Sequence, residues 1–218
     1  MIYIRSLLFV FGLMVCSLGI SLAIKVDYLG IHPWDVLNVA LFEQLGLSIG
    51  AWSIIVGAIL IVTAFILDKS YIKIGTFLNA MIMGVMIDFF LSLGILPEAT
   101  YTWIDVVIII VGIILLGIGG GLYNAAKIGA GPRDGFMLSI SDKTGLSVGL
   151  VRIITELLVL IIAWLIGGTI FIFTFIFTFI QSPIFQFVYL HASRIVDRYD
   201  EQWKARKFQR RQSLPRAK

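Results

Sequence analysis

The segment GIHPWDVLNVALFEQLGLSIGAWSIIV, residues 30–56, occurs a second time in this chain as GAGPRDGFMLSISDKTGLSVGLVRIIT, residues 129–155. Aligned without a gap, the two copies share nine identical residues, whereas ordinary residue frequencies would give roughly two by chance. The sequence therefore predicts an internal duplication, and many membrane transporters are built from duplicated halves. The identical pairs are Gly30/Gly129, Pro33/Pro132, Asp35/Asp134, Gly46/Gly145, Leu47/Leu146, Ser48/Ser147, Gly50/Gly149, Ile54/Ile153 and Ile55/Ile154.

The composition around these copies is that of an integral membrane protein. Only 14% of the 218 residues are charged, and the mean hydropathy is +1.00. A chain this apolar is typical of membrane proteins rather than of soluble domains. The single cysteine, Cys16, excludes an internal disulfide and is expected to be a small buried residue. The apolar run 6–24 lacks a cleavage site and is interpreted as a retained membrane helix.

The lengths of the apolar segments predict an all-α polytopic protein with six transmembrane helices. A bilayer core of about 30 Å needs about 20 helical residues. Two further helical segments, 33–44 and 132–143, are too short to cross and are expected to be re-entrant or interfacial helices. The six expected spans cover residues 5–24, 50–67, 72–94, 103–124, 148–167 and 169–190.

The distribution of Lys and Arg predicts the orientation of these spans. The tail 191–218 contains nine Lys or Arg and three acidic residues, and cytoplasmic segments are enriched in Lys and Arg. With six spans, both termini are then expected to be cytoplasmic, on the same side as the basic loops 68–73 and 124–147. The loop 95–102 has Glu98 and no basic residue, so it falls outside.

Three spans per repeat have a consequence for the whole architecture. An odd number inverts the second copy relative to the first, and inverted repeats are common in secondary transporters, which bind substrate between the repeats. We therefore expect membrane repeat 1 over residues 1–94, membrane repeat 2 over 95–190, and a basic cytoplasmic amphipathic tail over 191–218. The tail is expected to lie along the membrane surface and bind anionic lipids, and no nucleic acid is expected.

The repeated Pro-x-Asp motif has two interpretations. Proline favours the first position of a helix, and Asp35 or Asp134 in the first turn would cap free N–H groups, which gives a structural explanation. Alternatively, two opposed short helices point their N-termini into a central cavity, where they would hold an ion or a polar ligand. Trp34 is expected to belong to the aromatic belt at the membrane interface.

If the two motifs converge, they define a candidate ligand or ion site. Its expected members are His32, Asp35, Asn38, Arg133 and Asp134. His32 could titrate near neutral pH, although a single interfacial histidine is more often only hydrogen-bonded.

Further polar residues lie inside the expected spans. Arg152 and Glu156 are separated by one helical turn, and charges inside a membrane are costly and usually functional. Together with Asp88 they are candidate gating or proton-linked groups, although the pair could also be a neutralised structural contact. Asn79 and Asp88 could line a polar path or bond between helices, and the bond between helices is favoured for Asn79. Gly117 and Gly121 form a G-x-x-x-G pair that is expected to serve helix packing.

Motifs for most other chemistries are missing from the sequence. It contains no H-E-x-x-H, C-x-x-C, Walker A or G-x-S-x-G motif. Its two histidines are far apart, which makes a zinc site improbable. We therefore expect no enzyme, no cofactor and no metal, and a homo-oligomer is left open.

The chain resembles the YczE/YyaS/YitT family of bacterial integral membrane proteins. The resemblance rests on SLGISLAIKVDYLGIHPWDVLN with GLSIG, and on GLYNAAKIGAGPRDGFMLSIS followed by KTGLSVGLVRIITE. It extends to about residue 190 and implies a small multi-pass protein of the bacterial plasma (inner) membrane, whose biochemical role is largely unassigned and which is often described as a transporter. It transfers no functional residues.

The expected function is therefore a small secondary transporter with a site between inverted repeats and an unknown substrate. Asp35, Asp134 and Arg133 are the residues expected to contact the ligand. The alternative is a non-transporting membrane scaffold or regulator that acts through its basic tail.

Overall fold

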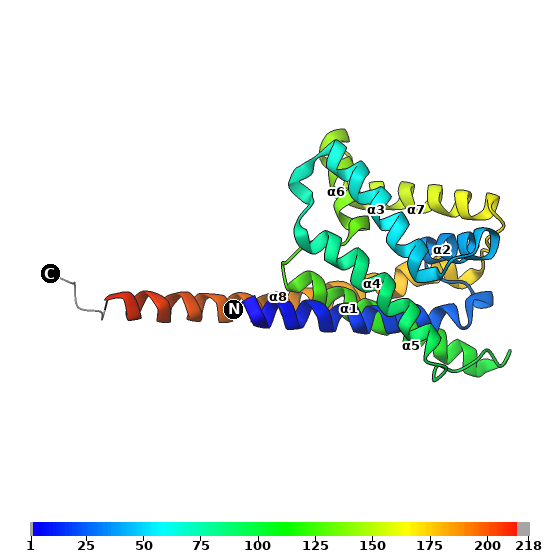
Figure 1. Ribbon diagram of the computed structural model, residues 1–218, viewed down its shortest axis with the longest axis horizontal. Helices are drawn as coiled ribbons and strands as arrows, with labels where there is room; N and C mark the ends of the chain where they lie inside the picture. The colour runs from blue at the N-terminus through cyan, green and yellow to red at the C-terminus, as the bar shows by residue number, and fades with distance from the viewer. Residues whose placement is uncertain (1, 213–218) are drawn as a thin grey trace.

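The chain folds into a bundle of helices (Figure 1). The structure, a computed structural model, describes residues 2–212, with side chains described for residues 2–177 and 179–203. Within residues 2–212 there is no β-strand. The helices are α1 (Ile2–Ile24), α2 (Pro33–Leu45), α3 (Ile49–Leu67), α4 (Ile74–Ser92), α5 (Trp103–Ala125), α6 (Pro132–Thr144), α7 (Val148–Leu165) and α8 (Ile172–Gln212), with 3₁₀ turns η1 (Asp27–Leu29) and η2 (Lys69–Tyr71).

The prediction of an all-α protein with six membrane spans is confirmed. Six helices of the described chain, α1, α3, α4, α5, α7 and α8, are long and apolar enough to cross a bilayer. Their bounds agree closely with the expected ones, except at the C-terminal end of α8. The short helices α2 and α6 have 13 residues each and are not among these six.

The two copies of the repeated segment fold in the same way locally. α2 and α6 both begin with a proline at the first helical position, and each ends at a glycine, Gly46 or Gly145, with positive φ. The helix that follows is capped by the equivalent serine in both copies. The hydroxyl of Ser48 accepts from the Ala51 N–H, and that of Ser147 accepts from the Leu150 N–H.

Glycines allow α5 to pack closely on both of its neighbours. Gly112 and Gly119 of α5 lie against Gly19 and Gly12 of α1, and a Cβ atom at Gly19 would come within 2.6 Å of the Gly112 carbonyl oxygen. On another face of α5, Gly117 and Gly121 lie against α8. The prediction that this G-x-x-x-G pair serves helix packing is therefore confirmed. Small residues are the usual means by which membrane helices approach each other.

The shorter helices pack around this α1–α5–α8 layer. α3 packs against α4 and α6, and α2 packs against α7. At the α3–α4 contact, Asp88 of α4 accepts hydrogen bonds from the Ser48 hydroxyl and from the Gly50 N–H, 2.8 Å away. Asp88 therefore caps the N-terminus of α3 from a neighbouring helix.

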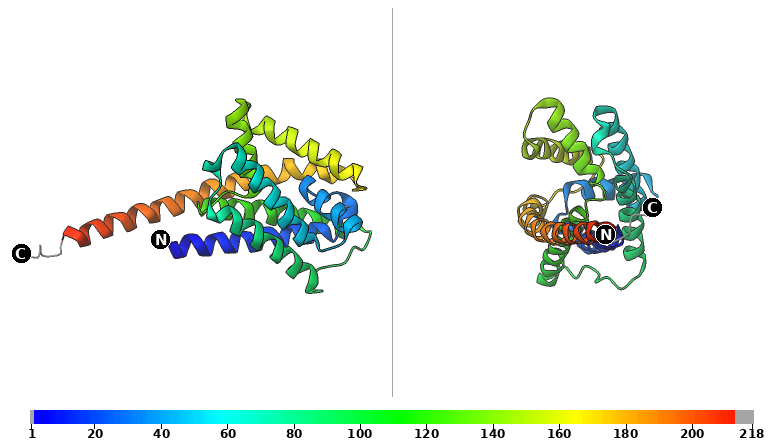
Figure 2. Two further views of the ribbon diagram at one scale, coloured as in Figure 1. Left: turned by 45° about the horizontal axis from the view of Figure 1, so that its top comes forward. Right: turned by 90° about the vertical axis from the view of Figure 1, so that its left-hand side faces the viewer.

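Helix α8 differs from the expectation of a membrane span followed by a separate surface helix. It is a single helix over Ile172–Gln212, and it extends beyond the bundle past the N-terminus of α1 (Figures 1 and 2). Two ion pairs hold this extension to the bundle, Lys127–Asp197 at 2.7 Å and Arg5–Asp200 at 3.4 Å. The last part of the expected tail, residues 213–218, lies outside the described residues.

Candidate functional site

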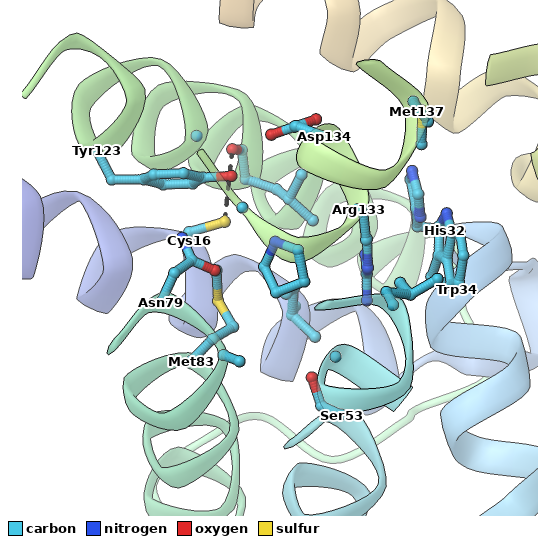
Figure 3. A pocket seen from close by; sticks show the side chains of 18 of the residues that line it. Cys16, His32, Trp34, Ser53, Asn79, Met83, Tyr123, Arg133, Asp134 and Met137 are labelled. Carbon is cyan, nitrogen blue, oxygen red and sulfur yellow. Dashed lines mark hydrogen bonds between the residues drawn. The ribbon is translucent and has the colours of Figure 1, made fainter. Parts of the chain in front are cut away.

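A cavity lined by both polar and apolar side chains lies at the centre of the bundle, and residues from each of the helices α1 to α8 contribute to it (Figure 3). The volume open to water-sized molecules is about 150 Å³, roughly ten times the ~15 Å³ that one buried water needs. The cavity can therefore hold a small solute. We refer to it as the central cavity.

The N-termini of α2 and α6 meet at the central cavity. His32 and Trp34 from the start of α2 line it together with Arg133 and Asp134 from the start of α6. The Arg133 guanidinium lies 3.1 Å from an Asp35 carboxylate oxygen, and its carbon is 5.4 Å from the centroid of a Trp34 ring. An ion pair and a cation–π contact thus join the two copies of the motif.

These helix N-termini are not capped in the way that the structural interpretation expected. The residues at the N-cap positions, His32 and Gly131, make no side-chain capping hydrogen bond. Asp35 instead accepts its hydrogen bond from Arg133. The positive ends of both helices therefore point towards the central cavity without a side-chain cap at the N-cap position.

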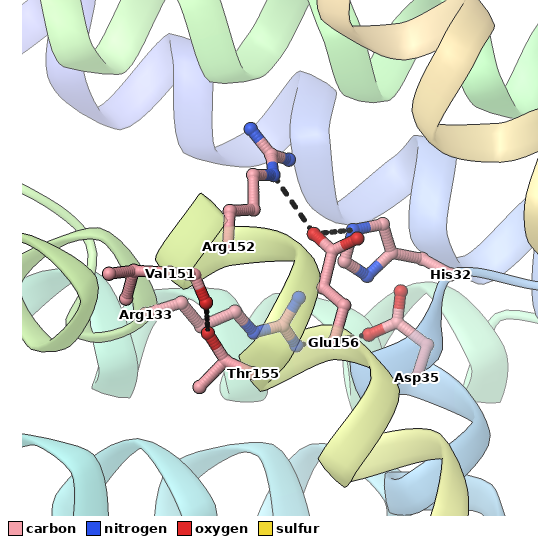
Figure 4. A network of polar contacts seen from close by, with 7 residues as sticks. All are labelled: His32, Asp35, Arg133, Val151, Arg152, Thr155 and Glu156. Atoms are coloured by element: carbon pink, nitrogen blue, oxygen red, sulfur yellow. Dashed lines mark hydrogen bonds and ion pairs between the residues drawn. The ribbon is translucent and has the colours of Figure 1, made fainter. Parts of the chain in front are cut away.

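A second ion pair lines the same cavity from α7 (Figure 4). The Arg152 Nε donates to a Glu156 carboxylate oxygen at 2.9 Å, as their spacing of one turn predicts. The same oxygen lies 3.9 Å from His32 Nε2. Glu156 therefore lies between Arg152 and the start of α2, and it is only 8% exposed.

A third group of polar atoms surrounds Gly131. A Cβ atom at this position would lie 3.1 Å from the Tyr123 hydroxyl, 3.3 Å from an Asp134 carboxylate oxygen and 3.7 Å from the Asn79 Oδ1. Three oxygen atoms from α4, α5 and α6 thus converge on one point, which only glycine leaves open. No ion pair of Asp134 is found among the described residues.

Several buried polar atoms that line the central cavity have no hydrogen-bond partner within the described structure. They are His32 Nδ1, Trp34 Nε1, Asn79 Nδ2 and Gln181 Oε1. Each of the four side chains is at least nine-tenths buried. Buried polar groups are normally satisfied by protein, water or a ligand, so these atoms mark the cavity as a place for a polar guest.

The structure brings together most of the residues that the sequence singled out. His32, Arg133, Asp134, Arg152 and Glu156 line the central cavity. Asp35 is not part of the lining, but it holds Arg133 there. Asn38 is 1% exposed and also lies outside the lining, with no partner for its Oδ1 among the described residues. Asp88 caps α3 and does not reach the cavity.

The expectation for Trp34 is wrong, and for Asn79 the favoured one of two alternatives is wrong. Trp34 is 3% exposed and lines the central cavity, so it does not belong to an interfacial belt. The Asn79 Nδ2 has no hydrogen-bond partner among the described residues, and Asn79 lines the cavity, which is the other alternative that the sequence left open. Tyr123 and Gln181 were not singled out from the sequence. The only sequence signal for them was a polar group inside an apolar span.

Polar contacts also close the ends of the bundle outside the spans. Tyr28 in η1 donates to Asp105 at 2.5 Å, which raises the pKa of Tyr28 to about 12. In the loop before η2, hydrogen bonds from Ser70 lower the pKa of Asp68. Tyr71 donates to Asp142 of α6. These contacts hold the loops that lead into α4 and α5.

The fold and the central cavity define a polytopic α-helical membrane protein with a polar site between its helices. The chain belongs to the family described as "Family of unknown function (DUF6198)", whose model matches residues 3–190. This result agrees with the expected resemblance to YczE and YyaS.

Three relatives are similar over most of the chain. The chain is 43% identical over 160 residues to the Bacillus subtilis (strain 168) protein named "Uncharacterized membrane protein YczE", covering 73% of both chains. It is 31% identical over 160 residues to an "Uncharacterized protein" of Haemophilus influenzae, covering 73% of this chain and 72% of that protein. It is 30% identical over 162 residues to "Uncharacterized protein YyaS" of Bacillus subtilis, covering 73% of this chain and 79% of that protein. No solved structure matches the chain.

Proposed function

We propose that the protein is a small secondary transporter of the bacterial plasma membrane, with the central cavity as its substrate site. The observation that carries the proposal is the meeting of two uncapped helix N-termini at a cavity with unpartnered buried polar atoms. Short helices whose N-termini point into a central site are a recurring feature of such transporters.

The packing of the helices supports an inverted repeat. In the two halves, α2 corresponds to α6 and α3 corresponds to α7. α2 packs against α7, and α6 packs against α3, so the two contacts are equivalent under exchange of the halves. The first helices of the halves, α1 and α5, pack against each other. This pattern is expected when a two-fold axis relates the halves, and three spans per half make such an axis lie in the membrane plane.

The proposal is tested by ligand binding. The purified protein in detergent is screened by thermal shift against sodium, potassium, phosphate, the common amino acids, short carboxylic acids and amines. A ligand that binds the folded state raises the melting temperature. The same screen is run on the double variant Asp35→Asn/Asp134→Asn, which should lose the shift. Glu98→Gln is the matched control, since this carboxylate is 81% exposed and lies outside the cavity.

A hit is then followed by uptake into proteoliposomes. Uptake by the wild type and its loss in the double variant would support the proposal. Uptake that survives neutralisation of both Asp35 and Asp134 would place the substrate path elsewhere. No binding and no uptake across the whole panel would shift the weight to the second candidate.

The second candidate is a membrane scaffold that acts through the cytoplasmic end of α8. It is favoured by the extension of this helix beyond the bundle (Figure 1) and by the Lys and Arg in residues 204–218. A chain that ends at Trp203 keeps the ion pairs of Asp197 and Asp200. Under this alternative the truncation abolishes function while the Pro-x-Asp motifs tolerate change, and the transporter proposal expects the opposite.

A further inference from the structure

We infer that the central cavity binds a small zwitterion, an organic molecule with one anionic and one cationic group a few bonds apart. The inference rests on the proposed function and gives its substrate class. Polar groups of opposite character occupy two regions of the cavity wall. In Figure 3, Trp34 and His32 lie beside the Arg133 side chain, while Tyr123 and Asp134 lie on the other side of the cavity.

The region around Arg133 is built to accept an anionic group. Arg133 donates one hydrogen bond to Asp35, and Arg152 donates one to Glu156, within the described structure. A guanidinium has five N–H donors, so each retains donors for a carboxylate. The indole Nε1 of Trp34 is a further donor, and it is buried without a partner. The start of α2, which has no side-chain cap at His32, adds positive partial charge on this side.

The region around Asp134 is built to accept a cationic group. Its carboxylate has no ion pair among the described residues, and the Tyr123 hydroxyl and the Asn79 Oδ1 approach the same point beside Gly131. Tyr123 and Asn124 hydrogen-bond to this carboxylate, but no positive charge lies in contact with it among the described residues, and a carboxylate inside a membrane protein is costly without one. An ammonium group would donate to these three oxygens and bring a positive charge into direct contact with Asp134, which interacts with Arg152 and Arg133 only at longer range.

The sum of the charges favours a ligand with no net charge. Three carboxylates (Asp35, Asp134, Glu156) and two guanidinium groups (Arg133, Arg152) give a net charge of −1 with His32 neutral. Each helix N-terminus is equivalent to roughly +0.5 charge, so the starts of α2 and α6 together contribute about +1. The cavity is therefore close to neutral but strongly polarised, and a zwitterion matches both properties.

The experiment compares zwitterions with the two halves of the same molecule. The probes are alanine, β-alanine and 4-aminobutanoate, whose charged groups are separated by increasing numbers of carbons, together with propionate and ethylamine. Propionate is alanine without its amine, and ethylamine is alanine without its carboxylate. Dissociation constants are measured by calorimetry on the purified full-length protein. We expect at least one zwitterion to bind about tenfold or more tightly than either half, because each half leaves charged donors or acceptors unpaired.

Two variants assign the charged groups to their regions. Asp134→Asn should weaken the zwitterion about tenfold or more and leave propionate unchanged. Arg133→Gln should weaken the zwitterion to a similar degree and leave ethylamine unchanged. The conservative variants Asp134→Glu and Arg133→Lys should recover part of the affinity, which distinguishes a binding role from general damage to the fold. Glu98→Gln is again the control with unchanged binding.

The outcomes separate this inference from the proposed function. Ethylamine or propionate binding as tightly as every zwitterion would overturn the zwitterion class while leaving a substrate site in the cavity. The absence of binding by all three zwitterions would also overturn it, and the broader screen and the uptake assay would then decide the transporter proposal by themselves. An equal loss of all ligands in both variants would contradict the division of the cavity into two regions.

Discussion

At the residue scale, the Asp35–Arg133 ion pair is the contact that joins the two copies of the repeated motif. The Asp35 side chain is 3% exposed and that of Arg133 is 29% exposed. A charge this deeply buried is tolerated when its partner is present, and removing only the partner is costly. The pair therefore makes the assembly of the central cavity depend on both halves.

The variant Asp35→Asn should lower the free energy of unfolding by about 2 kcal/mol, because the partly exposed Arg133 guanidinium loses its charge-assisted hydrogen bond. The double variant Asp35→Leu/Arg133→Met should recover most of this loss, since a buried ion pair can often be replaced by apolar side chains. The free energies of unfolding of the single and the double variant are measured by reversible unfolding in mixed detergent micelles. If Asp35→Asn is as stable as the wild type, the pair does not hold the two motifs together.

Asp88 provides the contrasting case of a carboxylate whose role is structural. The variant Asp88→Ala should cost about 1–2 kcal/mol, because the N-terminus of α3 loses two hydrogen bonds. Ligand affinity at the central cavity should stay unchanged. Ser147 is the counterpart of Ser48 in the second copy and caps α7. The variant Ser147→Ala is the matched comparison and should lower the free energy of unfolding by about 1 kcal/mol. Changed transport without lost stability would instead favour the gating role that the sequence suggested for Asp88.

At the scale of elements, the crossing of α1 and α5 depends on glycines. A Cβ atom at Gly119 would lie 2.6 Å from the Gly12 carbonyl oxygen, and backbone atoms cannot move aside as a flexible side chain can. Gly149 at the start of α7 has open space around its Cβ position. The two glycines therefore differ in what an added methyl group would contact.

Gly119→Ala should destabilise the protein by about 2 kcal/mol through overpacking. Gly149→Ala should change the stability by less than about 1 kcal/mol, in the stabilising direction, because alanine favours a helix. Both variants are compared with the wild type by their free energy of unfolding and by the fraction of monodisperse protein on size-exclusion chromatography. Equal effects of the two substitutions would contradict the close contact of α1 with α5.

The extension of α8 is held by ion pairs that are partly exposed, with side-chain exposures between 22% and 50%. The double variant Asp197→Ala/Asp200→Ala should therefore cost less than about 1 kcal/mol per pair. It should nevertheless increase the rate of trypsin cleavage at Arg194 and Arg198. Glu201→Ala, on the same helix and without an ion pair among the described residues, is the control. Unchanged cleavage would show that packing alone holds the extension.

At the scale of the whole molecule, the distribution of basic residues predicts that both termini are cytoplasmic. In a Cys16→Ala background, a membrane-impermeant maleimide should label Glu98→Cys in intact cells and Ser70→Cys only after lysis. Both positions are exposed in loops that connect spans. Labelling in the opposite order would reverse the orientation of the entire bundle.

The sequence predicted the helices well because their causes are local. Apolar runs of sufficient length formed the spans, and Pro33 and Pro132 began the two short helices at the expected positions. The prediction was less accurate where a distant helix decides the role of a residue. Trp34 carries no local signal that distinguishes an interfacial tryptophan from one that lies under Arg133. The sequence around Asp88 likewise does not reveal that α3 is its partner.

The amino-acid sequence by itself therefore determined the class of protein, the duplicated order of its helices and most of the candidate polar residues, since hydropathy and helix-end signals act over a few residues. Only the tertiary structure decided which of those residues form a site. Asp35 and Arg133 are 98 positions apart, and their contact exists because the packed bundle brings the starts of α2 and α6 together. The same packing buries Trp34, Asn79 and Gln181 around the central cavity, an arrangement that no local pattern encodes.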